Sequence, residues 1–161
     1  MKIPDLNYFY FDLDRNIWDT IDKYGNPIWA RQLIFPIVEK NINEYMDDCL
    51  SVIKLQDGIE DYLDFLRSKD VNIGFISRGA NLNIAYKNQP SFLILEKFDI
   101  LKYFNAEHIL LHKNEKKHLS IDRTRFVYFD DSQEEISLMK ERKEESHCIL
   151  RSDFESWRDL F

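Results

Sequence analysis

The chain has 161 residues, a length that suits one domain and is too short for two full ones. Hydrophobic residues make up 44% of it and charged residues 32%, which indicates an ordered globular fold rather than a disordered chain. The formal net charge of −7 argues against a protein that coats nucleic acid, and no apolar stretch approaches the roughly 18 residues of a membrane helix. The two cysteines, Cys49 and Cys148, are far apart and favour a reducing compartment. We therefore expect a cytoplasmic protein without a nucleic-acid or membrane partner.

The first third of the chain begins with a strand and continues into a long insertion. Residues 7–13 are aromatic and almost continuously apolar, as expected of a strand that is buried on both faces. Residues 15–57 then separate this strand from the helix that should pack back onto it. Within this insertion a proline precedes apolar residues at helical spacing, which predicts a helix over 37–53. Such a helix would bury Cys49, expose Asp47 and make the insertion a small helical flap.

Strand and helix signals alternate over the rest of the chain. Asp57 is expected to cap a helix over 58–69. The later predictions, in chain order, are a strand over 71–77, helical residues over 79–104 in which Pro90 interrupts or restarts the helix, a strand over 108–111, a short helix over 116–121, a strand over 126–129, a helix over 134–142, a strand over 147–150 and a helical or frayed segment over 154–161. Strands that alternate with helices favour right-handed crossovers and a mainly parallel sheet. We therefore expect a single α/β domain over 1–161, with a Rossmann-like three-layer α/β/α core around a five-stranded sheet.

Polar residues stand where three of the predicted strands end. They are Asp12 and Asp14 after the first strand, Ser77 and Arg78 after the second, and Asp130 and Asp131 after the fourth. Taken singly, each is an ordinary turn or helix-cap residue. In an open parallel sheet, however, the carboxyl ends of the strands share one rim, where ligands bind. Carboxylates that converge there repel one another unless a cation lies between them, and oxygen ligands suit Mg²⁺.

Five segments of the chain carry motifs in an ordered series. They are FDLDRNIWD (11–19), FISRG (75–79), EKFDILKYF (96–104), KHLS (117–120) and FVYFDDSQEEI (126–136). This series resembles the haloacid dehalogenase superfamily of phosphotransferases, and within it the small magnesium-dependent phosphatases. The resemblance spans most of residues 7–150 and implies the superfamily's α/β core and hydrolysis of phosphomonoesters with Mg²⁺.

The resemblance also implies roles for individual residues. Asp12 would be the nucleophile that forms an aspartyl phosphate, and Asp14 would protonate the leaving oxygen and then activate the hydrolytic water. Ser77 and Lys117 would hold the phosphoryl oxygens. Arg78 would contact the phosphate or the body of the substrate, or else remain a surface arginine.

The same resemblance implies a set of ligands for Mg²⁺. Asp12 would bind the ion with its carboxylate and Asp14 with its backbone carbonyl. Of the pair after the fourth strand, Asp131 would be the direct ligand and Asp130 would support it. The substrate would be a phosphorylated small metabolite or a phosphoprotein, depending on whether the insertion over 15–57 closes over the site as a lid.

Two points stay open in the sequence. Lys113, Lys116 and Lys117 all precede the fourth strand, and Lys117 is preferred because Ile121 would anchor the same helix face four residues later. Asn16 stands two residues after the acid–base aspartate, where the superfamily usually has Thr or Val. This departure motivates an alternative, a catalytically weak relative that uses the phosphate-binding rim for recognition or assembly.

Overall fold

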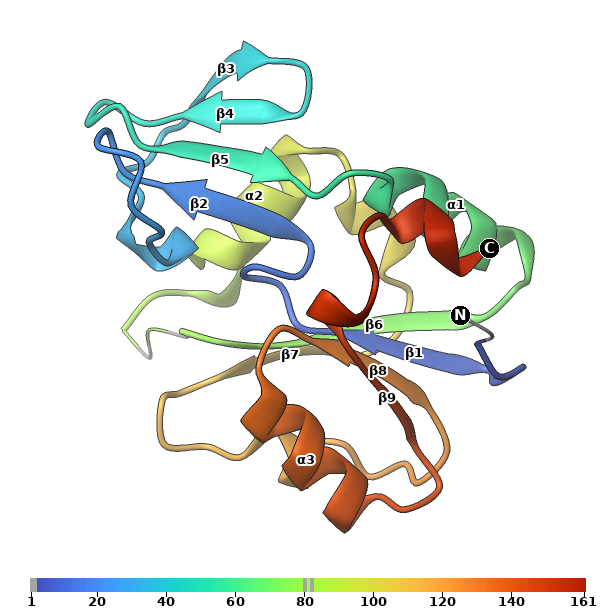
Figure 1. The fold of residues 1–161 in the computed structure, drawn as a ribbon. Coiled ribbons are helices and arrows are strands. Elements are labelled where there is room, and N and C mark those ends of the chain that lie inside the picture. Colours follow the sequence, from blue (N-terminus) through green and yellow to red (C-terminus); the bar gives the residue numbers. More distant parts are fainter. Residues whose placement is uncertain (1–2, 80, 82) are drawn as a thin grey trace.

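The core of the molecule is a five-stranded parallel sheet. The computed structural model describes residues 3–79, 81 and 83–161. The strands lie in the order β7-β6-β1-β8-β9, and every neighbouring pair is parallel (Figure 1). Their bounds are β1 (Tyr8–Phe11), β6 (Asn72–Arg78), β7 (His108–Leu111), β8 (Val127–Asp130) and β9 (His147–Leu150). The predicted α/β class with a five-stranded parallel sheet is confirmed.

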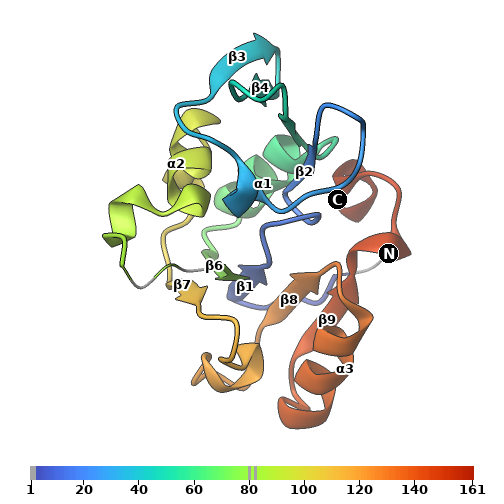
Figure 2. The same ribbon diagram turned by 90° about the vertical axis from the view of Figure 1, so that its left-hand side faces the viewer.

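Both faces of this sheet are covered, so the core has three layers (Figures 1 and 2). The helices are α1 (Ile59–Ser68), α2 (Pro90–Lys97) and α3 (Gln133–Arg142). Phe9 and Phe11 of β1 belong to one apolar cluster with Tyr62 of α1, while Tyr10 belongs to the opposite cluster with Met139 of α3. Since successive side chains of a strand point to opposite faces, β1 needs apolar residues at every position.

The insertion over 15–57 forms a sheet of its own. Its strands lie in the antiparallel order β2-β5-β4-β3. Their bounds are β2 (Trp18–Ile21), β3 (Val38–Asn41), β4 (Glu44–Met46) and β5 (Val52–Leu55). The predicted helix over 37–53 is wrong, because β3, β4 and the start of β5 occupy this segment. One face of the sheet packs on the core through Trp18, Ile53 and Leu55, which are buried.

A buried carboxylate organises the loop between β4 and β5. Asp47 is only 2% exposed, and its side chain accepts hydrogen bonds from the backbone N–H groups of Ile34, Cys49 and Ser51 at 3.0, 2.9 and 2.8 Å. The expectation that Asp47 is solvated on a helix face is therefore wrong. Cys49, expected to be buried, is exposed. Both errors follow from the missing helix.

Several helix boundaries differ from the predictions. Helix α1 follows Gly58, whose φ of 75° lies in the left-handed region, and Asp57 provides no side-chain cap. Of the two roles expected for Pro90, it takes the second and starts a helix, α2, where its fixed φ suits the first turn. Short 3-10 turns flank it, η2 (Tyr86–Asn88) and η3 (Leu101–Tyr103). Positions 80 and 82 of the predicted 79–104 helix lie outside the described residues.

The C-terminal segment is packed rather than frayed. It contains the 3-10 turns η5 (Arg151–Asp153) and η6 (Trp157–Leu160), and Trp157 is fully buried. The Trp157 ring lies against Phe11, Tyr62 and Phe129, so this segment completes the core on the α1 side. Within the described part of the chain, no helix combines the length and apolar character required to cross a bilayer.

Candidate active site

The carboxyl ends of β1, β6 and β8 open into a cavity of about 510 Å³. All six strand-end residues singled out in the sequence line it, namely Asp12, Asp14, Ser77, Arg78, Asp130 and Asp131. Of the three candidate lysines, Lys113 and Lys117 line the cavity and Lys116 does not. The parallel register explains this convergence, because β1 pairs with both β6 and β8 and the three strands end side by side.

A buried lysine connects the two central aspartates. Lys117, on the 3-10 turn η4 (Lys117–Leu119), places its Nζ 2.8 Å from Asp12 Oδ1 and 2.6 Å from Asp130 Oδ2. Burial alone would lower the pKa of the Lys117 ammonium, but the charges of Asp12 and Asp130 outweigh it and raise that pKa. Burial raises the pKa of Asp12, and the charge of Lys117 opposes this rise. The ammonium thus keeps a positive charge fixed beside Asp12.

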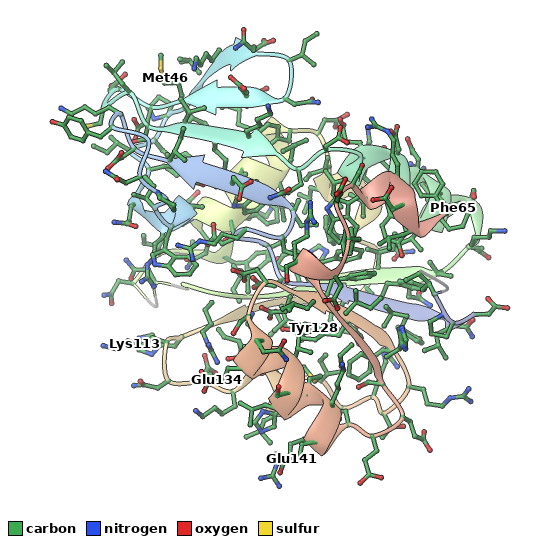
Figure 3. The ribbon with its side chains drawn as sticks, viewed as in Figure 1. Met46, Phe65, Lys113, Tyr128, Glu134 and Glu141 are labelled. Atoms are coloured by element: carbon green, nitrogen blue, oxygen red, sulfur yellow. The ribbon has the colours of Figure 1, made fainter. Side chains whose placement is uncertain are left out.

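The two aspartates after β8 have different surroundings. Asp130 is fully buried, and its oxygens accept hydrogen bonds from the Tyr128 hydroxyl, from Lys117 and, at 2.8 Å, from the backbone N–H of Ser132. Figure 3 places Tyr128 in the middle of the molecule, close to the sheet. Asp131 makes no ion pair with any described residue. Burial and the charge of Asp130 raise the pKa of Asp131 to about 6.

Three carboxylates are arranged so that one ion could bind between them. One oxygen of each of Asp12, Asp130 and Asp131 lies within 4.8 Å of the others. Hard oxygen ligands suit Mg²⁺, and the single ammonium of Lys117 leaves negative charge uncompensated among them. The donor set therefore fits a magnesium ion. The side chain of Asp14 lies outside this cluster.

Two residues of the insertion hold the side chain of Asp14 in place. Its Oδ1 accepts hydrogen bonds from Trp18 Nε1 at 2.9 Å and from the Ala30 backbone N–H at 3.1 Å. Burial raises the pKa of Asp14, while these two hydrogen bonds lower it. A carboxyl group with a raised pKa can carry and donate a proton at a higher pH than usual. Trp18 is fully buried and acts here as a hydrogen-bond donor.

Residues of β6 and α3 form the opposite wall. Ser77 is 1% exposed at the end of β6 and faces the cavity. Arg78 forms an ion pair with Glu135 of α3. Glu135 is a cavity residue that sequence reasoning missed, although it lies in the motif segment 126–136.

The insertion contributes cavity residues that no sequence signal marked. Trp29 and Arg31 lie on either side of the start of η1 (Ala30–Gln32), and both line the cavity. Arg15, which follows Asp14 directly, has a left-handed φ of 60° and places its guanidinium 4.2 Å from the centre of the Trp29 ring. Arg15 could have been found from its position in the first motif. Trp29 and Arg31 reach the site only through the tertiary fold.

Comparison with known proteins gives the family. The model of the acid phosphatase family matches residues 3–150. No curated protein matches the sequence significantly. Among solved structures, a HAD-superfamily hydrolase from Ehrlichia chaffeensis is 13% identical with a TM-score of 0.54, and the match covers 98% of this chain and 95% of that one. The N-terminal part of the protein BF1531 from Bacteroides fragilis, which contains a phosphatase domain complexed with Mg, is 15% identical with a TM-score of 0.51.

These likenesses support the family at the level of the fold. The match to the BF1531 structure covers 89% of this chain but only 35% of the other, so this chain spans about a third of the length of that solved chain. The family match, by contrast, covers nearly the whole chain, including all the strand ends that line the cavity. The chain therefore belongs to the acid phosphatase family and is a HAD-type phosphatase, in a group whose members depend on magnesium.

Proposed function

We propose that this phosphatase hydrolyses phosphomonoesters through an aspartyl phosphate on Asp12. One observation carries the proposal: the buried Asp12 carboxylate lies 2.8 Å from a lysine ammonium, at the strand-end cavity that Ser77 also lines. The fixed positive charge of the ammonium favours the ionised form of Asp12, and an ionised carboxylate can attack phosphorus directly. Lys117 and Ser77 would hold the phosphoryl oxygens in line for this attack.

The reaction would proceed in two displacements. In the first, a carboxylate oxygen of Asp12 bonds to phosphorus as the ester bond breaks, and Asp14 gives its proton to the leaving alcohol. In the second, water attacks the phosphorus of the aspartyl phosphate while Asp14 takes a proton from it, which releases phosphate and restores Asp12. The burial of Asp14 and its hydrogen bonds from Trp18 and Ala30 support this role, because they fix the direction of the carboxyl group.

The proposed magnesium ligands are the carboxylates of Asp12 and Asp131 and the backbone carbonyl of Asp14. Asp130 would support the site without binding the ion directly, because its carboxylate oxygens already accept hydrogen bonds from Lys117, Tyr128 and Ser132. When bound, the ion would neutralise negative charge on the phosphoryl group. The Mg in the BF1531 structure supports the choice of metal.

The whole chain would act as one catalytic domain. Its insertion would form a wall of the cavity through Trp29 and Arg31 and would not need to move as a lid. A phosphorylated substrate follows from the family. A cytoplasmic location and the absence of nucleic-acid and membrane partners stay predictions from composition.

Release of phosphate from p-nitrophenyl phosphate, with Mg²⁺ and with a chelator, tests the mechanism. We expect Mg²⁺-dependent turnover that Asp12→Asn abolishes. Asp14→Asn should slow the second displacement, so that acid-quenched protein retains labelled phosphate. Asp48→Asn, an exposed substitution in the loop between β4 and β5, is the control. Activity that survives both Asp12→Asn and Asp14→Asn would refute the assigned roles.

The alternative is a catalytically weak relative that only recognises phosphorylated ligands. Asn16 motivates it, because the residue departs from the superfamily pattern close to Asp14. Mg²⁺-dependent binding of a phosphorylated ligand without turnover would favour this alternative. Turnover by the wild-type chain would exclude it.

A further inference from the structure

A second cavity adjoins the active site. It has a volume of about 500 Å³ and shares two lining residues, Arg31 and Lys113, with the strand-end cavity. Arg31 comes from the insertion and Lys113 from the loop after β7, at the outer edge of the molecule in Figure 3. Because both cavities are bounded by these two side chains, a ligand could extend from one into the other.

The two cavities differ in charge. The strand-end cavity contains five carboxylates, from Asp12, Asp14, Asp130, Asp131 and Glu135. Over the described residues, the second cavity is lined by no carboxylate at all, and its ionisable side chains are Arg31, His112 and Lys113. Arg31 and Lys113 form no ion pair with a described residue. In a chain of net charge −7, the second cavity is thus a locally basic site on the border of an acidic one.

Arg31 lies against a glycine at the end of the second motif. Gly79 follows β6 with a φ of +102°, a conformation that L side chains rarely adopt. A Cβ at this position would lie 3.4 Å from Arg31 Cδ, so the side chain of Arg31 passes directly over the Gly79 backbone. The insertion thus brings a guanidinium across the loop that follows Ser77, next to the phosphate site.

We propose that the second cavity binds an anionic group on the leaving-group side of the substrate, so that the preferred substrates are small phosphomonoesters carrying a second phosphate or a carboxylate. This inference rests on the proposed function and specifies its substrate class. The reacting phosphoryl group occupies the strand ends, and the leaving group must extend away from Asp12 because transfer is in line. Arg31 and Lys113 then meet the far end of the substrate. Two cavities of this size suit a small ligand rather than a protein surface.

Matched substrate pairs test the proposal. Each pair differs by one anionic group. 3-Phosphoglycerate has a carboxylate that glycerol 3-phosphate lacks, and fructose 1,6-bisphosphate has a second phosphate that fructose 6-phosphate lacks. We expect the doubly anionic member of at least one pair to have the higher kcat/KM. Arg31→Met and Lys113→Met should each lower that kcat/KM by about tenfold, the effect of one charge-assisted hydrogen bond. Turnover of p-nitrophenyl phosphate, which lacks a second anion, should fall by a clearly smaller factor, so that each variant narrows the preference for the doubly anionic substrate.

Two exposed basic residues that line neither cavity serve as controls. Lys116→Met and Arg125→Met remove the same charges elsewhere and should change no substrate preference. Equal kcat/KM within both pairs, or a preference that survives both Arg31→Met and Lys113→Met, would overturn the proposal. A phosphoserine peptide with acidic neighbours that is used better than either small substrate would also overturn it.

A binding measurement separates this inference from the proposed function. The same substrate pairs are titrated calorimetrically into the Asp12→Asn variant, with and without Arg31→Met. If the wild-type chain shows no hydrolysis, the proposed function fails. The subsite is still supported if the Asp12→Asn variant binds the doubly anionic ligand more tightly than its singly anionic partner and Arg31→Met removes this difference. Equal binding within each pair refutes the subsite whatever the activity.

Discussion

Asn16 Nδ2 donates a hydrogen bond to the backbone carbonyl of Asp12 at 2.8 Å. The same amide lies 3.4 Å from the carbonyl of Phe129 on β8, and the side chain is fully buried. Asn16 therefore ties the turn that carries the proposed nucleophile to the neighbouring strand. The departure from the superfamily's usual Thr or Val gives this chain an amide donor that serves two carbonyl oxygens.

This relationship predicts the effect of two substitutions. Asn16→Ala should lower the free energy of unfolding by about 1–3 kcal/mol, because it leaves a buried carbonyl without a donor. Asn16→Asp is nearly isosteric but would turn a carboxylate oxygen toward two carbonyls, so it should cost more than Asn16→Ala. Both should lower kcat by roughly 10–100-fold, since a small displacement of Asp12 misaligns the attack. Urea unfolding and p-nitrophenyl phosphate turnover measure these effects.

The exposed Asn114 offers the matched control for Asn16. Asn114→Asp should change neither the stability nor the rate appreciably. If Asn16→Asp is as stable as Asn16→Ala, the amide does not act as the donor described.

Lys117 should stabilise the site most strongly when no divalent cation is present. Lys117→Met leaves Asp12 and Asp130 buried side by side, and breaking such an ion pair costs about 3–5 kcal/mol. With Mg²⁺ the loss should be smaller, because the bound ion would compensate part of the same negative charge. Thermal unfolding in EDTA and in Mg²⁺ measures the difference, with Lys116→Met as the control. An equal loss in both conditions would count against a cation site at these carboxylates.

The parallel core could be predicted because its signals are local. A strand buried on both faces has to be apolar over most of its length, and residues 8–11, 73–76 and 127–129 have this character. Parallel strands end at a common rim, so the polar residues after them could be assigned to one place without knowing any contact. The family resemblance, carried by the same segments, is confirmed by the match over residues 3–150.

The insertion could not be predicted in this way. Its strands have three or four residues each, too few for a period of two to stand out from a helical period. Asp47 accepts a hydrogen bond from the backbone N–H of Ile34, 13 residues earlier, and nothing in the sequence marks that partner. Arg31 reaches the second cavity only because the insertion sheet packs on the core. These contacts are tertiary, and a short amphipathic segment follows its surroundings more than its own propensity.

The stability of the insertion should depend on Asp47 more than on its neighbour. Asp47→Ala removes the acceptor of three backbone hydrogen bonds and should lower the free energy of unfolding by about 3 kcal/mol. Asp48→Ala, one residue later and exposed, should change it by less than about 0.5 kcal/mol. Urea unfolding compares the two. Similar values for both variants would mean that the loop is held by other contacts.

The C-terminal segment should make stability depend on acid pH through Asp57. Hydrogen bonds from Ser156 at 2.8 Å and from Arg158 at 2.7 Å lower the pKa of Asp57. A carboxyl group whose pKa is lowered on folding stabilises the protein above its unfolded-state pKa, near 3.8, and loses this contribution as the pH falls through the folded-state pKa. Arg158→Met should therefore be less stable than the wild type at pH 6, and the gap should close as the pH falls below about 4. Urea unfolding between pH 3 and pH 7 measures the gap.

Arg142→Met, which removes an exposed ion pair to Glu141, is the control and should keep the wild-type pH dependence. A gap that is constant across this range would show that Arg158 contributes by packing and not by its charge.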